Sequence, residues 1–83
     1  MTEFNVHIGA MEIAYDFINE TNKFNCEMDL ISSDRRFIVN AKSILGVMSL
    51  DLSKKLYLKL YSDDPVEVGA IRMALIAFID KAA

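Results

Sequence analysis

The sequence has little of what most metal and redox sites are built from. Cys26 is the only cysteine and His7 is the only histidine. One cysteine cannot form an intramolecular disulfide or a cysteine cage for a metal, and a lone histidine has no second ligand for zinc or haem. Cys26 alternates with the apolar Met28 and Leu30, so we interpret it as a core residue. The sequence therefore predicts no metal site and no cofactor.

Basic charge and long apolar runs are also scarce. The formal net charge is −3 and the pI is about 4.9, which argues against the basic face that nucleic-acid binding needs. No apolar run approaches the ~20 residues that span a bilayer, and no basic segment followed by an apolar one stands at the N-terminus. We therefore expect a soluble, cytoplasmic protein with no nucleic-acid or membrane partner.

The remaining composition is typical of one globular domain. Eighty-three residues leave no room for a second core. Hydrophobic residues make up 53% of the chain and charged residues 25%, a balance that favours a folded chain over a disordered one. We predict that residues 1–83 form a single domain.

Four segments alternate between apolar and polar residues, as strands with one buried face do. They span residues 3–8, 24–32, 36–41 and 55–61. Ser33-Asp34-Arg35 has the composition of a turn, so the middle two strands should form an antiparallel hairpin. The residues predicted to point inward are Phe4, Val6, Ile8, Phe24, Cys26, Met28, Leu30, Leu56, Leu58 and Leu60.

Two segments repeat apolar residues at helical spacing. The first, residues 10–21, is expected to end at Asn22 in the left-handed conformation. The second begins at Asp64-Pro65-Val66-Glu67, which combines an acidic N-cap, proline at the first helical position and a capping-box glutamate, and it should run to about Lys81. The first apolar stripe comprises Ala10, Ile13, Ala14, Phe17, Ile18 and Thr21; the second comprises Val68, Ile71, Leu75, Phe78 and Ile79, widened by Val66, Met73 and Ile76.

A shorter helix is expected from Ser43 to about Leu50. Ser43 is a natural N-cap, because its hydroxyl can accept a hydrogen bond from a free backbone N–H at the start of a helix. Ile44, Val47 and Met48 follow at a spacing that places them on one face. A helix this short is not stable alone in water, so it must dock on a larger body.

The predicted order of elements is β-α-β-β-α-β-α. One-sided alternation in the strands requires an antiparallel sheet with one covered face. We therefore predict an α+β fold, an open-faced sandwich in which helices cover a four-stranded antiparallel sheet.

The segment from Lys42 to Leu50 reads KSILGVMSL. It resembles, almost letter for letter, the regulatory serine segment of HPr, the small phosphocarrier of the bacterial sugar phosphotransferase system. The order of elements is that of HPr proteins as well, and the resemblance extends weakly from about Ala14 to Ile79. It implies an HPr-like sandwich fold and a role in sugar-transport regulation and catabolite repression, without enzymatic activity.

The chain departs from HPr at the phosphoacceptor. HPr carries phosphate on a histidine at the start of its first helix, in the motif Gly-[Leu/Ile]-His-x-Arg-Pro-Ala. Counting back from Phe17 places this motif on residues 8–14, where only Ala14 matches. Ala10 stands at the histidine position, and Glu12 stands at the arginine position, where a carboxylate repels phosphate. The chain is similar in this respect to the HPr-like catabolite repression protein, which lacks the histidine and keeps the serine.

His7 is the one remaining histidine candidate for a phosphoacceptor. It lies in a predicted strand, three residues before Ala10, with no arginine or proline at the spacing of the motif. Activation of an imidazole requires positioned partners, and the sequence around His7 offers none. We favour a solvent-facing strand residue.

Ser43 has two interpretations. It can serve only as a helix cap, or it can also be the target of HPr kinase, as the resemblance implies. A phosphate at this place would lie at a helix N-terminus, where backbone N–H groups favour an anion.

The helix opened by Ser43 is also the predicted partner surface. In the HPr family it presents an apolar patch to enzyme I and, after serine phosphorylation, to the catabolite control protein. Four large apolar residues on so short a helix cannot all point inward, so we expect one or two of Ile44, Leu45 and Met48 to be exposed. The predicted partner-binding residues are Lys42, Ile44, Leu45, Val47 and Met48.

Two other groups of residues have ordinary structural explanations. Tyr57 and Tyr61 on the outer strand face could form a second patch, but cross-strand pairing is the favoured interpretation. Asp63, Asp64 and Glu67 could suggest a metal, but helix capping accounts for them.

Three functions stay open at this point. The favoured one is an HPr-like regulatory module that binds phosphotransferase-system proteins, HPr kinase or the catabolite control protein. The alternatives are a phosphocarrier that uses His7 or another unconventional acceptor, and a purely structural interaction domain. The sequence does not give the oligomeric state.

Overall fold

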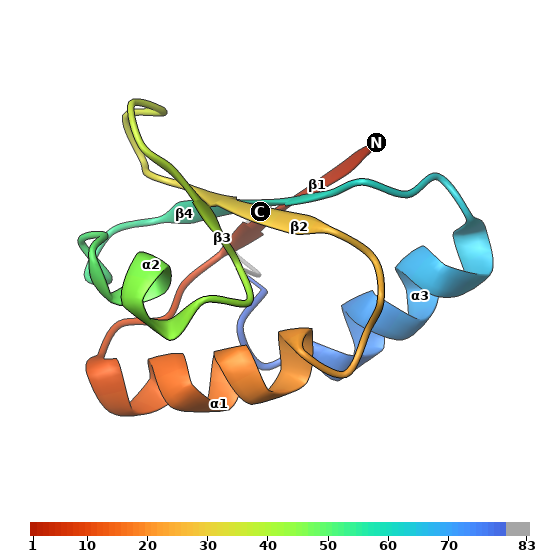
Figure 1. The fold of residues 1–83 in the computed structure, drawn as a ribbon, viewed down its shortest axis with the longest axis horizontal. Coiled ribbons are helices and arrows are strands. Elements are labelled where there is room, and N and C mark those ends of the chain that lie inside the picture. The colour runs from red at the N-terminus through yellow and green to blue at the C-terminus, as the bar shows by residue number, and fades with distance from the viewer. Residues whose placement is uncertain (80–83) are drawn as a thin grey trace.

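The computed structural model describes residues 1–79 and has the predicted order of elements (Figure 1). Each expected helix and strand is present, although most are shorter than the sequence pattern suggested. The elements are β1 (Thr2–Val6), α1 (Met11–Thr21), β2 (Met28–Ile31), β3 (Ile38–Asn40), α2 (Ile44–Met48), β4 (Leu56–Leu60) and α3 (Pro65–Ala74).

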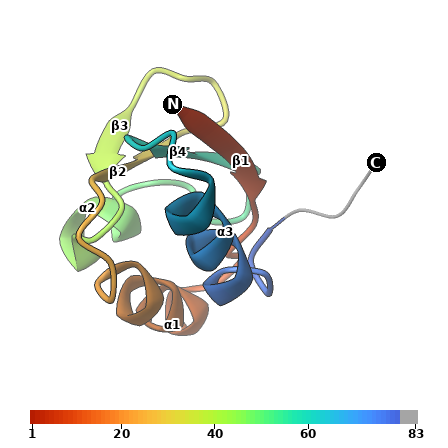
Figure 2. The ribbon, with the colours of Figure 1, turned by 90° about the vertical axis from the view of Figure 1, so that its right-hand side faces the viewer.

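The four strands form one antiparallel sheet in the order β1-β4-β2-β3. β2 and β3 make the expected hairpin, with Leu30 opposite Val39. All three helices lie on one side of this sheet and leave the other side open (Figures 1 and 2). The predicted open-faced sandwich is therefore confirmed.

The core lies between the sheet and the helices. Leu56, Leu58 and Leu60 of β4 all point into it, each at most 1% exposed, as their alternation predicted. The rings of Phe17 on α1 and Phe78 meet edge to face, with centroids 5.4 Å apart, an arrangement that aromatic pairs favour. Cys26 is also buried there, as predicted, and burial raises the pKa of its thiol.

The apolar stripe of α1 is narrower than predicted. Ala14, Phe17 and Thr21 are fully buried, but Ala10 and Ile13 are exposed. Ala10 is the N-cap, with extended φ/ψ, so it lies outside the helical face. The prediction that these two residues join the core was wrong.

The end of α1 also differs from the prediction. Asn22 has φ −71° and ψ −10°, which is right-handed rather than left-handed. Its side-chain amide donates to the carbonyl oxygens of Ile18, at 2.9 Å, and Lys42, at 3.2 Å. Asn22 therefore ends the helix through side-chain hydrogen bonds that join α1 to the segment before α2.

α3 ends at Ala74 and does not continue toward Lys81, which lies outside the described residues. The helix ends because the following residues make tertiary contacts with the segment around β1. Ile79 forms an antiparallel bridge with Val6, and the backbone N–H of His7 donates to the carbonyl of Phe78 at 2.8 Å. The chain must leave the helix to reach β1. Ile71, Leu75 and Phe78 are buried as predicted, whereas the expected widening residues Val66, Met73 and Ile76 are exposed.

On the outer face of the sheet, the Arg35 side chain contacts residues of two strands. Arg35, in the turn after β2, has a positive φ of 61°, and its Nη2 donates to Glu3 Oε1 on β1 at 2.7 Å. Between these two ends, the Arg35 guanidinium lies 3.9 Å from the centre of the Tyr57 ring on β4. The hydrogen bond from Arg35 holds the pKa of Glu3 below its usual value. This contact links an edge strand to the hairpin turn across β4.

The second tyrosine of this face is also held by a neighbouring strand. The Tyr61 hydroxyl donates to Asp29 Oδ2 at 2.5 Å, and this bond, more than any other cause, raises the pKa of Tyr61. Tyr57 and Tyr61 thus both make contacts between strands or with the hairpin turn, in line with the interpretation favoured for them.

Thr21 offers a test of the junction between α1 and α2. Its buried hydroxyl donates to the carbonyl oxygen of Ala41 at 3.0 Å. In Thr21→Val that carbonyl loses its donor inside the core, so the free energy of unfolding should fall by about 1–2 kcal/mol. Urea denaturation monitored by circular dichroism measures the change.

The same substitution at Thr2 is the matched control. The Thr2 hydroxyl lies at the sheet edge, 3.4 Å from the carbonyl of Ser62, and valine suits a strand. Thr2→Val should change stability by less than about 0.5 kcal/mol. Equal losses in the two variants would show that the buried hydrogen bond is not the cause.

Candidate functional site

Ser43 caps α2 as predicted. Its backbone is extended, with φ −100° and ψ 117°, and its Oγ accepts a hydrogen bond from the backbone N–H of Gly46 at 3.2 Å. The carbonyl of Ser43 accepts the N–H of Val47 at 2.9 Å, which starts the helical pattern. The residue is half-buried, and its hydroxyl oxygen holds the first turn of the helix through this part-buried hydrogen bond.

The side chains of α2 divide sharply between core and solvent. Val47 is 0% exposed, whereas Leu45 is 81% exposed. Ile44 and Met48 are half-buried between these extremes. The expectation that part of this apolar set is exposed is confirmed, but the assignment of Val47 to the partner surface was wrong, because Val47 fills the core beneath it.

The orientation of α2 depends on a close approach at Gly46. A Cβ at this position would lie 3.2 Å from the Cβ of Val39 on β3 and 3.4 Å from the Oγ of Ser43. A larger residue would require Val39 or the Ser43 cap to shift by a few tenths of an ångström. Glycine therefore lets α2 lie directly on the end of the hairpin, with Leu45 directed away from it.

Lys42 precedes the cap and is held by backbone groups. Its ammonium donates to the carbonyl of Phe24, and its own N–H donates to Asn40 Oδ1 at 2.9 Å. The carbonyl of Lys42 accepts the amide of Asn22. The side chain is half-buried, so Lys42 fixes the entry to α2 as well as adding positive charge beside it.

The start of α1 is the position at which HPr carries its histidine. Ala10 is the N-cap there, without a side-chain hydrogen bond, and Glu12 lies in the first turn. Both side chains are exposed. A methyl group has no lone pair with which to attack phosphorus, and the Glu12 carboxylate is an anion already placed near the free N–H groups of the helix.

His7 lies between β1 and α1, and its side chain is exposed. Its ring is close to Gly9, where an added Cβ would lie 3.4 Å from Cε1 and where φ is +85°. Within residues 1–79 the imidazole makes no hydrogen bond and no ion pair. His7 is therefore solvent-facing, as we favoured, but it is not a strand residue as predicted, because β1 ends at Val6. The described part of the chain gives it no partner that would activate it.

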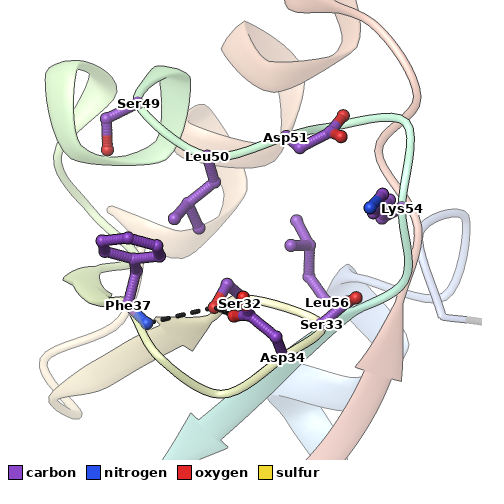
Figure 3. Close-up of a pocket in the computed structure, with 9 residues that line it drawn as sticks. All are labelled: Ser32, Ser33, Asp34, Phe37, Ser49, Leu50, Asp51, Lys54 and Leu56. Atoms are coloured by element: carbon purple, nitrogen blue, oxygen red, sulfur yellow. Dashed lines mark hydrogen bonds between the residues drawn. The ribbon is translucent and has the colours of Figure 1, made fainter.

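The structure contains one feature that sequence reasoning missed, a surface pocket of about 180 Å³ (Figure 3). The loop after β2 and the loop after α2 face each other across it. Sequence analysis assigned residues 33–35 only to a turn, and no local pattern indicates that two loops so far apart in the chain share a pocket. Its lining residues are Ser32, Ser33, Asp34, Phe37, Ser49, Leu50, Asp51, Lys54 and Leu56.

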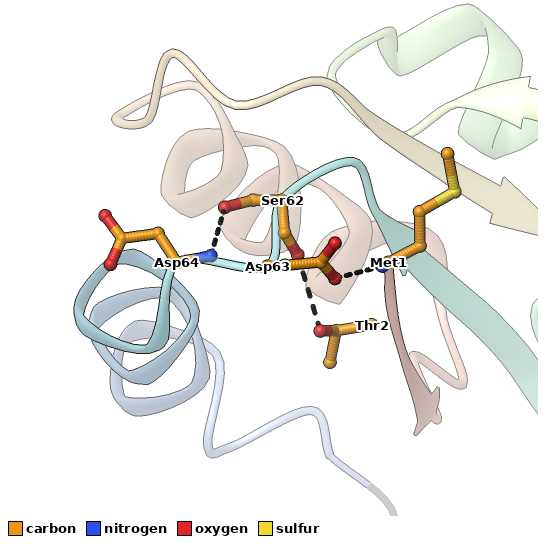
Figure 4. Close-up of polar contacts among 5 residues, drawn as sticks. All are labelled: Met1, Thr2, Ser62, Asp63 and Asp64. Atoms are coloured by element: carbon orange, nitrogen blue, oxygen red, sulfur yellow. Dashed lines mark hydrogen bonds and ion pairs between the residues drawn. The ribbon is translucent and has the colours of Figure 1, made fainter.

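The acidic residues before α3 act as structural groups (Figure 4). Asp64 Oδ1 accepts the N–H of Val66 at 3.0 Å, as an N-cap should. The N–H of Asp64 donates to Ser62 Oγ at 3.2 Å, so the expected capping box with Glu67 is replaced by a serine. Asp63 pairs with the N-terminal ammonium of Met1. Among the described residues, no group of three His, Cys, Asp or Glu side chains could hold a metal ion.

The chain is similar to known proteins in both sequence and structure. A family model described as "PTS HPr component phosphorylation site" matches residues 10–81. The "HPr-like protein Crh" of Halalkalibacterium halodurans is 38% identical over 65 residues, which cover 78% of this chain and 74% of that protein. No helix in residues 1–79 is long and apolar enough to cross a membrane.

Two solved structures share the fold. The crystal structure of HPr-C-His from Thermoanaerobacter tengcongensis matches with a TM-score of 0.70 and 28% identity, over 93% of this chain and 92% of that one. The histidine-containing phosphocarrier protein of a Mycoplasma matches with a TM-score of 0.65 and 20% identity, over 92% and 93% of the two chains. At that identity the second match is a likeness of fold alone.

The cap at Ser43 can be tested by stability. Ser43→Ala removes the acceptor for the Gly46 N–H and should lower the free energy of unfolding by about 1 kcal/mol, whereas Ser43→Asp keeps a capping oxygen and should remain close to wild type. Ser33→Ala, in the exposed turn after β2, is the control and should shift stability by less than about 0.5 kcal/mol. Urea denaturation of the four proteins measures this, and a Ser43→Ala variant as stable as wild type contradicts the capping role.

Proposed function

The chain belongs to the HPr family, and on this basis we propose that it is a regulatory protein-binding module whose phosphorylation site is Ser43. Proteins of this family are phosphocarriers or regulators related to the phosphotransferase system, not enzymes, and they interact with the proteins of that system. The finer assignment is ours: a single cytoplasmic HPr-like domain of residues 1–83 that does not carry phosphate on histidine.

The observation that carries the proposal is the contrast between the two helix starts. At α1, Ala10 and Glu12 provide no nucleophile and no positive charge. At α2, Ser43 is a half-buried N-cap with a hydroxyl group, and Leu45, two residues later in the first turn, is 81% exposed. A domain with this arrangement can receive phosphate as a signal but lacks the group that would transfer it.

Phosphorylation of Ser43 would change the surface without refolding the domain. A phosphate carries nearly two negative charges at neutral pH, and the Gly46 N–H already points at the serine oxygen from 3.2 Å. The cap can therefore become a charge-assisted hydrogen bond. The new charge would lie at the start of the same short helix that exposes Leu45. One partner could then contact both the anion and the apolar side chain.

The partners that fit this proposal are HPr kinase, which would modify Ser43, and the catabolite control protein or phosphotransferase-system enzymes, which would bind α2. The contact residues are Leu45, which is fully available, and Ile44, Met48 and Lys42, which are half-buried. Val47 is buried in the core, where its packing holds α2 against the rest of the domain.

Intact-mass spectrometry tests the phosphorylation site. With ATP and HPr kinase, the protein should gain one phosphate, and Ser43→Ala should gain none. Ser49→Ala is the matched control, because Ser49 is an exposed serine at the opposite end of α2, and it should be modified like wild type.

A parallel reaction with phosphoenolpyruvate and enzyme I tests the alternative. We expect no added mass there, while an HPr control is labelled. An acid-labile phosphate that disappears in His7→Ala would establish a phosphocarrier and refute the proposal. If HPr kinase labels the HPr control but leaves this chain unmodified, Ser43 is only a cap.

Leu45 provides a test of the partner surface. Burying a leucine side chain at an interface contributes about 1.5–3 kcal/mol, so Leu45→Ser should weaken binding to HPr kinase about tenfold or more. Val66→Ser is the control, since Val66 on α3 is 80% exposed and lies on another helix. Isothermal titration calorimetry measures both, and equal affinities for the two variants would place the surface elsewhere.

A further inference from the structure

We propose that the pocket at the carboxyl end of α2 binds one arginine side chain of a protein partner. This pocket lies beyond the C-cap residue Ser49, at the opposite end of α2 from Ser43. Figure 3 shows Leu50 and Leu56 pointing into it from the two sides, with Phe37 beside them. The inference does not rest on phosphorylation of Ser43, which takes no part in the pocket.

The size of the pocket admits one side chain. Its volume is about 180 Å³, and an apolar cavity of about 150 Å³ holds one benzene molecule. Leu50 and Leu56, at most 8% exposed, line the pocket from two sides, while Phe37 is 62% exposed at its wall. A long side chain with an apolar stem can pack on the leucines, and a planar cation can stack on an aromatic ring.

Two carboxylates stand on the rim. Asp34 Oδ1 accepts from Ser32 Oγ at 2.6 Å and from the N–H of Arg36 at 3.0 Å. Asp51 Oδ1 accepts from Ser53 Oγ at 2.6 Å and from the Ser53 N–H at 3.1 Å. These bonds hold the pKa values of both groups below their usual range, so both are anionic at neutral pH. All four of these hydrogen bonds use the Oδ1 atom of Asp34 or Asp51, and none uses Oδ2.

Lys54 is the only cation among the lining residues, all of which are described. The lining residues carry two carboxylates and one ammonium, a net charge of −1. Arg36 beside the pocket also acts electrostatically on Asp34, as Lys54 does on Asp51. A cationic ligand must therefore bond a carboxylate directly, and the lining does not favour an anion. Arginine fits better than lysine, because its planar guanidinium can bond a carboxylate and stack on an aromatic ring at once. The same protein shows this combination in Arg35, which bonds Glu3 at 2.7 Å and lies over Tyr57 at 3.9 Å.

The test is a titration of the full ¹⁵N-labelled chain with the peptide acetyl-Gly-Arg-Gly-amide, followed by amide chemical shifts. We expect saturable shifts in residues 33–37 and 50–54, with a dissociation constant on the order of 1 mM, as suits a single side chain. The citrulline peptide has the same shape without the charge and should bind at least fivefold more weakly.

Charge variants of the pocket should move the affinity in both directions. Asp34→Asn with Asp51→Asn keeps the Oδ1 acceptors of the turns and should weaken binding at least fivefold, whereas Lys54→Gln should strengthen it. Glu12→Gln with Asp16→Asn on α1 changes the net charge equally and should leave the affinity unchanged, and Ser43→Ala should also bind like wild type.

Three results would overturn the inference. One is an equal response to the arginine and citrulline peptides. Another is a set of shifts centred outside the two loops, for example on α1. The third is unchanged affinity when both Asp34 and Asp51 are replaced by asparagine in a protein whose spectrum remains that of the folded chain.

Discussion

The close approach of α2 to β3 at Gly46 is the contact on which the proposed partner surface depends. A helix of five residues has no stability of its own, so its orientation is set by what it touches. With Gly46 against Val39 and Val47 in the core, Leu45 can only point to solvent. The two ends of the helix are placed by the same contact: Ser43 at the entry, and the pocket-lining Ser49 at the exit.

Local physics made much of the fold predictable. The alternation of Leu56, Leu58 and Leu60 fixed which face of β4 is buried, and the proline after Asp64 marked the start of α3. The limits of the elements were not predictable in this way. α3 stops at Ala74 because Ile79 must reach Val6, and that bridge joins two ends of the chain that no sequence window contains.

In the candidate site, too, features set by local contacts could be predicted and features set by distant contacts could not. Ser43 was predictable as a cap because its hydrogen bond spans only three residues. The separate roles of Leu45 and Val47 were not, since both are apolar and only the position of β3 decides which of them is buried. The pocket could not be predicted from local sequence, because Asp34 and Asp51 belong to two loops far apart in the chain. Each loop is ordered by its own turn.

The cap at Ser43 has an evolutionary consequence. Because the hydroxyl stabilises α2 by about 1 kcal/mol whether or not a kinase ever reaches it, selection for a folded domain favours a capping residue at this position by itself, and serine is one of the residues that suffice. A lineage that lost the kinase would lose the signal before it lost the residue. A serine retained at this position is therefore explained by the cap and is not by itself evidence of regulation.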